Sequence, residues 1–364
     1  MISSATSRAL SVPSNSVVNK CTAAPHPSVR SGVRIEYGSG VNASARGWRE
    51  IPELGTTLGL RLVMAMCDLL GRRLTRAFVG VLAFYYALAA RDARRGSAEY
   101  LQRLGQPHGF FAVYAHIRCF AHTVLDRLYF VRDRFENFDI RYHGHEHLLD
   151  LLEQGKGAVL LGAHIGSFEV MRAQSVARDI PINIVGDFGN AERINAVLQR
   201  INPKSTTRML QITPGSVEFA LKVGEAVERG ELVAILGDRH GHGTSIAIDF
   251  LGGRARFPVG PYLLAATLRC PLYFVVSVHR APNRYDLYCE PFAEALVLPR
   301  GNRQEALREC VQRYAMRLEH FCKIAPNNWF NFFPFWDQED EPLAPSSTPP
   351  RDPLSSGPNE APRS

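Results

Sequence analysis

The sequence predicts an α/β fold in which a mixed, mostly parallel central sheet is flanked by helices and preceded by an apolar helical region. Short apolar runs at 158–161 and 232–236 are typical of buried strands. Segments with helical spacing, such as 217–229, lie between these runs. Strands that alternate with helices favour parallel pairing, and sites in such sheets lie at the carboxyl ends of the strands.

Length and composition bound the possible classes of protein. The chain has 364 residues, 46% of them hydrophobic, which is enough for one large domain or two smaller ones. Its net charge of +7 favours an acidic partner such as anionic lipid or an acidic carrier protein. The basic residues are scattered, so no run indicates nucleic acid. The seven cysteines show no C-x-x-C spacing, which suits a reducing compartment and indicates no zinc ribbon.

Composition divides the chain into four predicted regions. Residues 1–45 and 338–364 are expected to be disordered tails, because they cannot bury a core. Residues 46–135 form an apolar and basic helical region, and residues 136–337 form the α/β core. The apolar run 77–90 is shorter than the roughly 20 residues of a membrane span. Flanking arginines favour a helix lying in or dipping into an anionic membrane surface; ordinary core-packing helices are the alternative.

The elements of the predicted core follow in order. A strand at 138–142 leads to His143, His145 and His147 just before a helix. Alternating histidines can bind metal, but no second ligand cluster matches them, so a solvated turn is expected and no metal site. Beyond 158–161, strands are predicted at 181–185, 209–212, 232–236, 246–250 and 272–278, and helices at 192–201, 217–229 and 303–322.

The segment GAVLLGAHIGSFE, residues 157–169, places His164 in a turn after a strand and Glu169 in the first turn of a helix. A histidine with a pKa near 6.5 is a suitable general base near neutral pH. A nearby carboxylate can orient its ring and stabilise the imidazolium. Ser167 also suggests a Ser-His-Glu arrangement, but no G-x-S-x-G elbow surrounds it.

Two downstream loops carry concentrated charge. The strand ending at 236 leads to Asp238 and Arg239, and a tight turn at Gly252 and Gly253 leads to Arg254 and Arg256. Each of these arginines could bind a phosphate or form a surface salt bridge; Arg256 is favoured for the anion contact. The aromatic run 327–336 either caps a core, walls an acyl pocket or touches lipid.

The order of four motifs carries more information than any one of them. GAHIGSFE, AILGDRHG, DFLGGRARFPVGPYLLA and PNNWFNFFPFW together resemble the lysophospholipid acyltransferase superfamily. The likeness is to its branch related to the lipid A (lauroyl and myristoyl) acyltransferases of Gram-negative bacteria. Within that branch the chain is similar to predicted acyltransferases of glycolipid and aryl polyene gene clusters. The resemblance covers about residues 47–336.

This resemblance implies an acyltransferase that moves a fatty acyl group from an acyl carrier protein or coenzyme A thioester to a hydroxyl of a lipid or glycolipid. It implies no cofactor and a location on the cytoplasmic face of the bacterial inner membrane, peripheral or shallowly anchored. His164 would be the base and Glu169 its orienting partner. The substrate-binding positions would be Ser167, Asp238, Arg239, Phe250, Gly252, Gly253, Arg254 and Arg256. A thioesterase or lipid hydrolase using the same dyad and a non-catalytic lipid-binding module are the alternatives.

Overall fold

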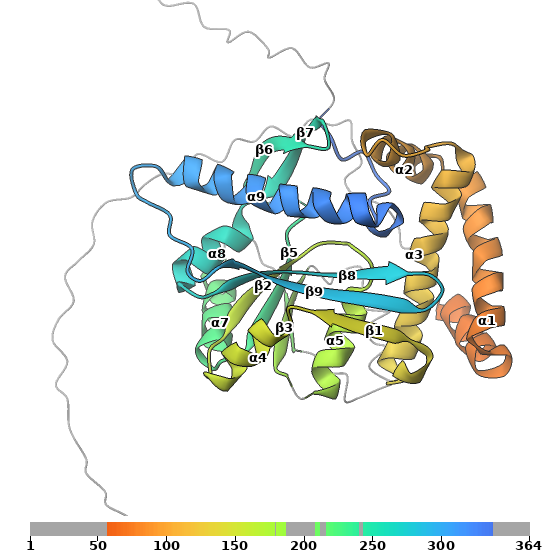
Figure 1. Cartoon of the computed structure of the whole chain (residues 1–364), viewed down its shortest axis with the longest axis horizontal. Coiled ribbons are helices and arrows are strands. Elements are labelled where there is room, and N and C mark those ends of the chain that lie inside the picture. The colour runs from red at the N-terminus through yellow and green to blue at the C-terminus, as the bar shows by residue number, and fades with distance from the viewer. Residues whose placement is uncertain (1–56, 179, 187–207, 212–215, 240–242, 338–364) are drawn as a thin grey trace, which may run out of the picture. The chain divides into compact units, whose positions relative to one another are not determined.

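A computed structural model describes residues 57–178, 180–186, 208–211, 216–239 and 243–337. Both predicted tails and the predicted helix at 192–201 lie outside these ranges. The described residues fall within a single compact unit, which spans 45–364 (Figure 1).

Along the chain, helices precede the first strand of the sheet, lie between its strands and follow its last strand. The α-helices are α1 (Thr57–Ala89), α2 (Arg91–Arg103), α3 (Phe110–Val131), α4 (Glu146–Glu153), α5 (Phe168–Ala177), α7 (Val217–Glu228), α8 (Gly260–Leu268) and α9 (Arg303–Ile324). Two 3-10 turns, η2 (Phe135–Asn137) and η4 (Pro326–Asn328), complete the helical elements.

The main sheet is mixed and mostly parallel, as predicted. Its strands are β1 (Asp139–His143), β2 (Ala158–Gly162), β3 (Ile182–Gly186), β4 (Arg208–Gln211), β5 (Leu232–Leu236), β8 (Leu272–Arg280) and β9 (Arg284–Ala293). Their order is β1-β9-β8-β2-β5-β3-β4, and only the β8–β9 pair is antiparallel. A separate hairpin consists of β6 (Ser245–Phe250) and β7 (Gly253–Pro258).

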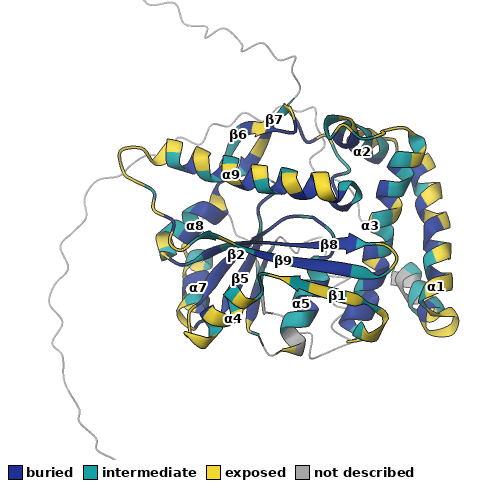
Figure 2. Cartoon of the chain, in the orientation of Figure 1, coloured by how far each residue is buried: buried dark blue, intermediate teal, exposed yellow. Residues whose placement is uncertain are grey.

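Strand β2 lies at the centre of the sheet and is buried on both faces (Figure 2). Val159 and Leu161 join the large core that also contains residues of α9. Ala158 and Leu160 join a second core together with residues of α4 and α5. Figure 1 accordingly shows α9 on one face of the sheet and α4 and α5 on the other. A continuous apolar run, without alternation, is what burial on both faces requires.

The three N-terminal helices pack against the sheet as well as against one another. Ala87 of α1, Tyr100 of α2 and Ile117 of α3 all belong to the large core. Helix α1 is broken at Gly71, whose φ of 71° lies in the left-handed region that favours glycine. Its second half therefore begins a new helix at Arg72.

The outer surface of α1 is apolar. Leu69, Val81 and Tyr85 are each at least two-thirds exposed, and Figure 2 shows α1 with many exposed positions. Within the described ranges, no single helix is long and apolar enough to span a membrane. The part of α1 from Leu62 onward and α2 meet those requirements together, as a pair bent by 95°.

Most predicted elements are present with ends shifted by one or two residues. Strand β5 is confirmed at the predicted residues, and α5 begins at Phe168, so Glu169 does lie in a first helical turn. Strands β7 and β9 were not expected from the sequence. In β9, charged residues interrupt the apolar pattern: Asp286 pairs with Arg280 and Arg284 of the sheet, and Glu290 pairs with Arg317 of α9.

A substitution of Leu161 tests whether β2 is the central, buried strand of the sheet. Its side chain is fully buried, so Leu161→Ala should lower the free energy of unfolding by about 2 to 5 kcal/mol. Leu221→Ala makes the same chemical change at a position of α7 that is 61% exposed, and should change stability by less than about 0.5 kcal/mol. Urea denaturation of both variants measures the difference. Equal losses would contradict the assignment of β2 as the core strand.

Candidate active site

Strands β2 and β5 end side by side, which brings together the loops that follow them. Gly162 pairs with Leu236 in the parallel register. The Gly162 carbonyl oxygen accepts hydrogen bonds from the Gly237 N–H at 2.9 Å and the Tyr314 hydroxyl at 2.8 Å. His164 follows the end of β2 and Asp238 follows the end of β5 at the same offset. The two side chains therefore meet at the carboxyl edge of the sheet, where sites in such folds lie.

Asp238 is fully buried and receives three hydrogen bonds. Its Oδ1 lies 2.8 Å from His164 Nδ1, and its Oδ2 accepts from the His164 backbone N–H at 3.0 Å. The same Oδ2 accepts from the Trp329 indole N–H at 2.9 Å. Because an ionised carboxylate can only accept, the proton of neutral His164 lies on Nδ1. Nε2 of His164 is then unprotonated and available as a base.

The charges of the site favour this protonation state. Burial alone would raise the pKa of Asp238, but His164, Arg239 and the Trp329 hydrogen bond together hold that pKa well below its usual range. Burial, aided by the charge of Arg239, lowers the pKa of His164, and Asp238 only partly opposes this. An ionised Asp238 beside a neutral His164 is the state that a general base requires before reaction.

The His164 turn is held between the end of β8 and the segment after α9. The His164 backbone carbonyl oxygen accepts the Phe330 N–H at 2.9 Å. Gly166 has a φ of 59°, and a Cβ there would overlap the Ser277 carbonyl oxygen. Its N–H donates to the Asn328 carbonyl oxygen at 2.8 Å. Any residue with a side chain at 166 would therefore displace the turn that carries His164.

Within the described ranges Glu169 forms no hydrogen bond or ion pair with His164, and the carboxylate that contacts His164 is that of Asp238. Glu169 Oε1 accepts from Arg172 one turn further along α5, and its Oε2 lies 3.2 Å from Arg127 Nε on α3. Two guanidinium groups thus hold the carboxylate of Glu169 between α5 and α3. The H-x4-E spacing singled out His164, and the structure pairs that histidine with Asp238 and not with Glu169.

Ser167 has a structural contact in place of the predicted substrate-binding one. It is 3% exposed, and its Oγ accepts the Val170 N–H at 3.3 Å at the start of α5. This is the usual contact of an N-cap serine. The geometry gives no support to a Ser-His-Glu arrangement: among the described residues Ser167 Oγ bonds to the Val170 N–H and not to His164, and the carboxylate at His164 Nδ1 is that of Asp238.

Arg239 and Phe250 lie beside the His164–Asp238 pair. Arg239 donates to the Phe330 carbonyl oxygen at 2.6 Å and its guanidinium lies 5.3 Å from the Phe333 ring centroid. Its Nε is buried and has no hydrogen-bond partner. Phe250 is fully buried and packs edge-on against Trp329 at 5.4 Å, behind Asp238. Phe250 therefore supports the site from the core side.

The β6–β7 turn is not brought to His164. Gly252 takes a φ of 71° at the turn, and Gly253 leaves room for Arg103, which lies over the Trp336 ring at 4.7 Å. Arg254 and Arg256 are on the exposed side of β7. Arg256 Nε lies 3.3 Å from Asp337, an ion pair that is half-exposed. The favoured anion role of Arg256 stays a prediction.

The three histidines at the end of β1 and just after it have separate surroundings. His143 stacks on Tyr288 with ring centroids 4.5 Å apart, and His145 lies 3.4 Å from Glu146. His147 lies at a tilt 6.4 Å from the ring of Tyr273. Among the residues that the structure describes, no group of three or more His, Cys, Asp or Glu could hold a metal ion.

The sequence did not identify Trp329 and Asn328 as parts of the site. Asn328 accepts the His279 N–H at 2.7 Å and donates to the His279 carbonyl oxygen at 3.1 Å. Trp329 is fully buried, so the 327–336 segment here caps a core. The clue in the sequence was an amide next to an indole within an aromatic run, but only the fold shows that both face the His164 turn.

The sequence profile of the bacterial lipid A biosynthesis acyltransferase family matches residues 123–338. The chain belongs to this family. The match begins within α3 and includes every residue of the His164–Asp238–Trp329 cluster. A comparison with curated proteins found no match. The acyltransferase activity transfers an acyl group other than an aminoacyl group to a lipid acceptor.

Burial keeps several histidines of the acyltransferase neutral. His116 on α3 lies between the Ser97 hydroxyl at 2.8 Å and the Trp329 carbonyl oxygen at 2.9 Å, and burial lowers its pKa to about 4. Burial also lowers the pKa of His122 to about 4 and that of His279 to about 3. Each of these histidines binds a proton more readily in the unfolded chain, where its pKa is about 6.5.

These shifts set the direction of the pH dependence of stability. Below about pH 6.5 the unfolded chain takes up protons that the folded chain does not. The free energy of unfolding should therefore be highest above pH 6.5 and should fall continuously towards pH 4. Chemical denaturation at pH 7.5, 6 and 5 measures this.

His122→Gln should make that dependence shallower, because the glutamine amide can still donate to the Arg76 carbonyl oxygen but does not titrate. Stability that is constant or rises between pH 7.5 and pH 5 would contradict the assignment of buried neutral histidines.

Proposed function

We propose that His164 is the general base of the acyl transfer and that Asp238 orients it. The observation that carries the proposal is the 2.8 Å contact between His164 Nδ1 and the buried Asp238 carboxylate. This contact fixes the tautomer that leaves Nε2 free, and it stabilises the imidazolium once Nε2 takes a proton. The His164 side chain is 31% exposed, so a substrate hydroxyl can reach it.

The reaction proceeds by direct transfer. Nε2 of His164 takes the proton of the acceptor hydroxyl while the oxygen attacks the thioester carbonyl carbon. The carbon–sulfur bond then breaks, and the departing thiolate receives the proton from the imidazolium. No enzyme nucleophile is needed, which agrees with the buried, capped Ser167. A positioned base of this kind contributes about 10² to 10⁴ in rate.

Arg239 is the proposed electrostatic partner of the reaction. Its charge lies near enough to lower the pKa of His164, and its Nε is a buried donor without a hydrogen-bond partner. A developing oxyanion at the thioester carbon would supply an acceptor for that donor. The contacts of Arg239 with Phe330 and Phe333 hold the guanidinium in place before substrate binds.

The proposed donor is the thioester of an acyl carrier protein or of coenzyme A, and the proposed acceptor is a lipid or glycolipid hydroxyl. The net charge of +7 suits the acidic surface of a carrier protein. The four-motif resemblance supports a glycolipid acceptor. The proposed location is the cytoplasmic face of the bacterial inner membrane.

The proposed membrane contact is the exposed apolar surface of α1 together with the start of α3. Leu69 is 83% exposed, Val81 67%, Tyr85 70% and Phe111 78%. Arginines lie among these residues on α1, as suits a helix at an anionic lipid surface.

The function is tested with the purified protein, a radiolabelled acyl carrier thioester and a bacterial membrane lipid extract. An acylated lipid supports transfer, whereas free fatty acid as the main product would support hydrolysis.

Asp238→Asn should lower the turnover by about 10³ to 10⁴, because an amide can donate to Nδ1 and so allows the wrong tautomer. His164→Ala should abolish transfer and leave the protein folded.

Two variants serve as controls. Asp249→Asn makes the same change at an exposed position of β6 and should keep the wild-type rate. Glu169→Gln should lower the melting temperature, since Glu169 joins α5 to α3, and should lower the turnover much less than Asp238→Asn does. Equal losses of turnover in Asp238→Asn and Glu169→Gln, with Glu169→Gln still at the wild-type melting temperature, would assign the orienting role to Glu169.

The membrane contact gives a separate prediction. Val81→Asp places a charge on the exposed apolar surface of α1 and should weaken binding to anionic vesicles by about tenfold or more. Val297→Asp makes the same change at a position that is 75% exposed before α9 and should have no effect. Vesicle co-sedimentation measures both. Binding of the wild type should also decrease with salt; equal binding to neutral and anionic vesicles would contradict the electrostatic part.

A further inference from the structure

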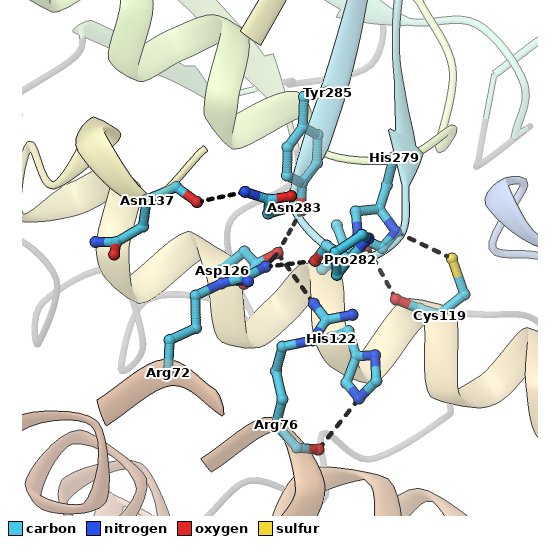
Figure 3. A network of polar contacts seen from close by, with 11 residues as sticks. Arg72, Arg76, Cys119, His122, Asp126, Asn137, His279, Pro282, Asn283 and Tyr285 are labelled. Carbon is cyan, nitrogen blue, oxygen red and sulfur yellow. Dashed lines mark hydrogen bonds and ion pairs between the residues drawn. The ribbon is translucent and has the colours of Figure 1, made fainter. Parts of the chain in front are cut away.

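A basic cavity lies away from His164, where the second half of α1 meets the turn between β8 and β9. Its volume is about 410 Å³, within the range of small-molecule sites. Arg72 and Arg76, which follow the Gly71 break in α1, face polar groups of two other segments (Figure 3), and Arg73 also lines the cavity. The lining residues are Arg72, Arg73, Arg76, Asn137, Pro282 and Asn283.

Arg72 fully engages the one carboxylate beside this cavity. Its Nε and Nη2 donate to the two oxygens of Asp126 at 2.9 and 2.8 Å, and Nη2 also donates to the Pro282 carbonyl oxygen. The Tyr285 hydroxyl donates to the same Oδ2 of Asp126 at 2.9 Å. Asp126 is fully buried, so these contacts leave its carboxylate little capacity for another donor.

The positive charge of Arg76 is only partly balanced, because Arg76 shares the carboxylate of Asp126 with Arg72. Its Nη1 lies 3.5 Å from Asp126 Oδ2, is buried, and has no hydrogen-bond partner among the residues that the structure describes. The side chain is 13% exposed, and burial lowers its pKa. In the described part of the chain, Asp126 is the only carboxylate in an ion pair with Arg72 or Arg76. Two nearly buried guanidinium groups therefore share one negative charge, and buried charges are normally paired.

Arg73 adds a third cation at the mouth of the cavity. It is exposed, and its side chain forms no hydrogen bond or ion pair within the described ranges. The helix that begins at Arg72 also points its positive N-terminal end to this region. His122, on the other side of Arg76, is neutral at pH 7 because its pKa is about 4. The unbalanced charge thus comes from the arginines alone.

We propose that this cavity binds a phosphate group, either of a membrane lipid headgroup or of a soluble phosphate ester. Several arginines that converge from one turn suit the several oxygens and the charge of phosphate. An anion there would balance Arg76 and accept from its unpartnered Nη1. The exposed apolar residues Leu69, Leu70 and Leu74 flank the arginines on α1, so a lipid surface lying on α1 would present its headgroups to the cavity.

The test measures the melting temperature of the full chain in inorganic phosphate and in sodium chloride of equal ionic strength. Phosphate at ten times its dissociation constant should raise the melting temperature by about 3 °C. Arg76→Gln should abolish this shift and, without phosphate, melt at or above the wild-type temperature, because it removes an unbalanced buried charge. Arg73→Ala, an exposed position that folding does not depend on, should weaken phosphate binding by about tenfold.

Arg303→Ala is the matched control, since it removes an exposed arginine at the start of α9 and should keep the full shift. An equal phosphate shift in the wild type and in Arg73→Ala, or loss of the shift in Arg303→Ala, would overturn the proposal. So would the absence of any shift in the wild type. An Arg76→Gln protein that melts well below the wild type would make Arg76 a structural partner of Asp126.

A second arm distinguishes the source of the phosphate. If the site takes a headgroup, vesicles of phosphatidic acid in phosphatidylcholine should bind the wild type more tightly than Arg73→Ala. If it takes a soluble ester, glycerol 3-phosphate should raise the melting temperature of the wild type more than inorganic phosphate does, and the vesicles should bind both proteins equally. Both measurements are repeated on His164→Ala. Because that variant lacks the proposed base, phosphate binding that persists in it separates this site from the fate of the acyl-transfer mechanism.

Discussion

The buried carboxylate of Asp238 is the constraint on which the site depends. A charge without solvent is tolerated only when donors surround it, and here the donors come from two distant segments, the His164 turn and Trp329. Trp329 in turn packs against Tyr100 at 5.0 Å and Phe335 at 4.9 Å in the core. The position of His164, the proposed base, is therefore fixed by the same contacts that close the core, and not by a loop of its own.

Helix α3 connects the parts of the molecule that the chain keeps far apart. His116, near its start, bonds to the Trp329 carbonyl oxygen, and Asp126, near its end, holds Arg72 of α1. The next residue, Arg127, reaches Glu169 of α5. An acidic residue at position 169 thus has a structural reason that needs no contact with His164: it joins α5 to the helix that also fixes Trp329 and α1.

The sequence predicted the fold class and the position of His164, the proposed base, just after the end of a buried strand. These follow from local patterns, because apolar runs mark buried strands and a histidine after such a run lies at a strand end. The partner of His164 could not be predicted in the same way. Glu169 is close in sequence, but the first turn of α5 directs it to Arg172, whereas Asp238 arrives because β5 pairs with β2. Strand order is a property of the whole sheet and has no local signal.

Asp238 and Asp126, two fully buried aspartates of the acyltransferase, differ in how their charge is balanced. Asp238 faces one arginine and a histidine that is neutral before reaction, so the site is near balance and gains a positive charge only when His164 takes a proton. Asp126 faces two arginines at once, which leaves an excess of one positive charge. No change of protonation near pH 7 removes this excess charge, because the neighbouring His122 and His279 are already neutral at that pH. A transient charge suits a catalytic step, in which the proton leaves with the product. A permanent one calls for a bound anion, and the arginines that carry it stand on the helix whose apolar residues face outward.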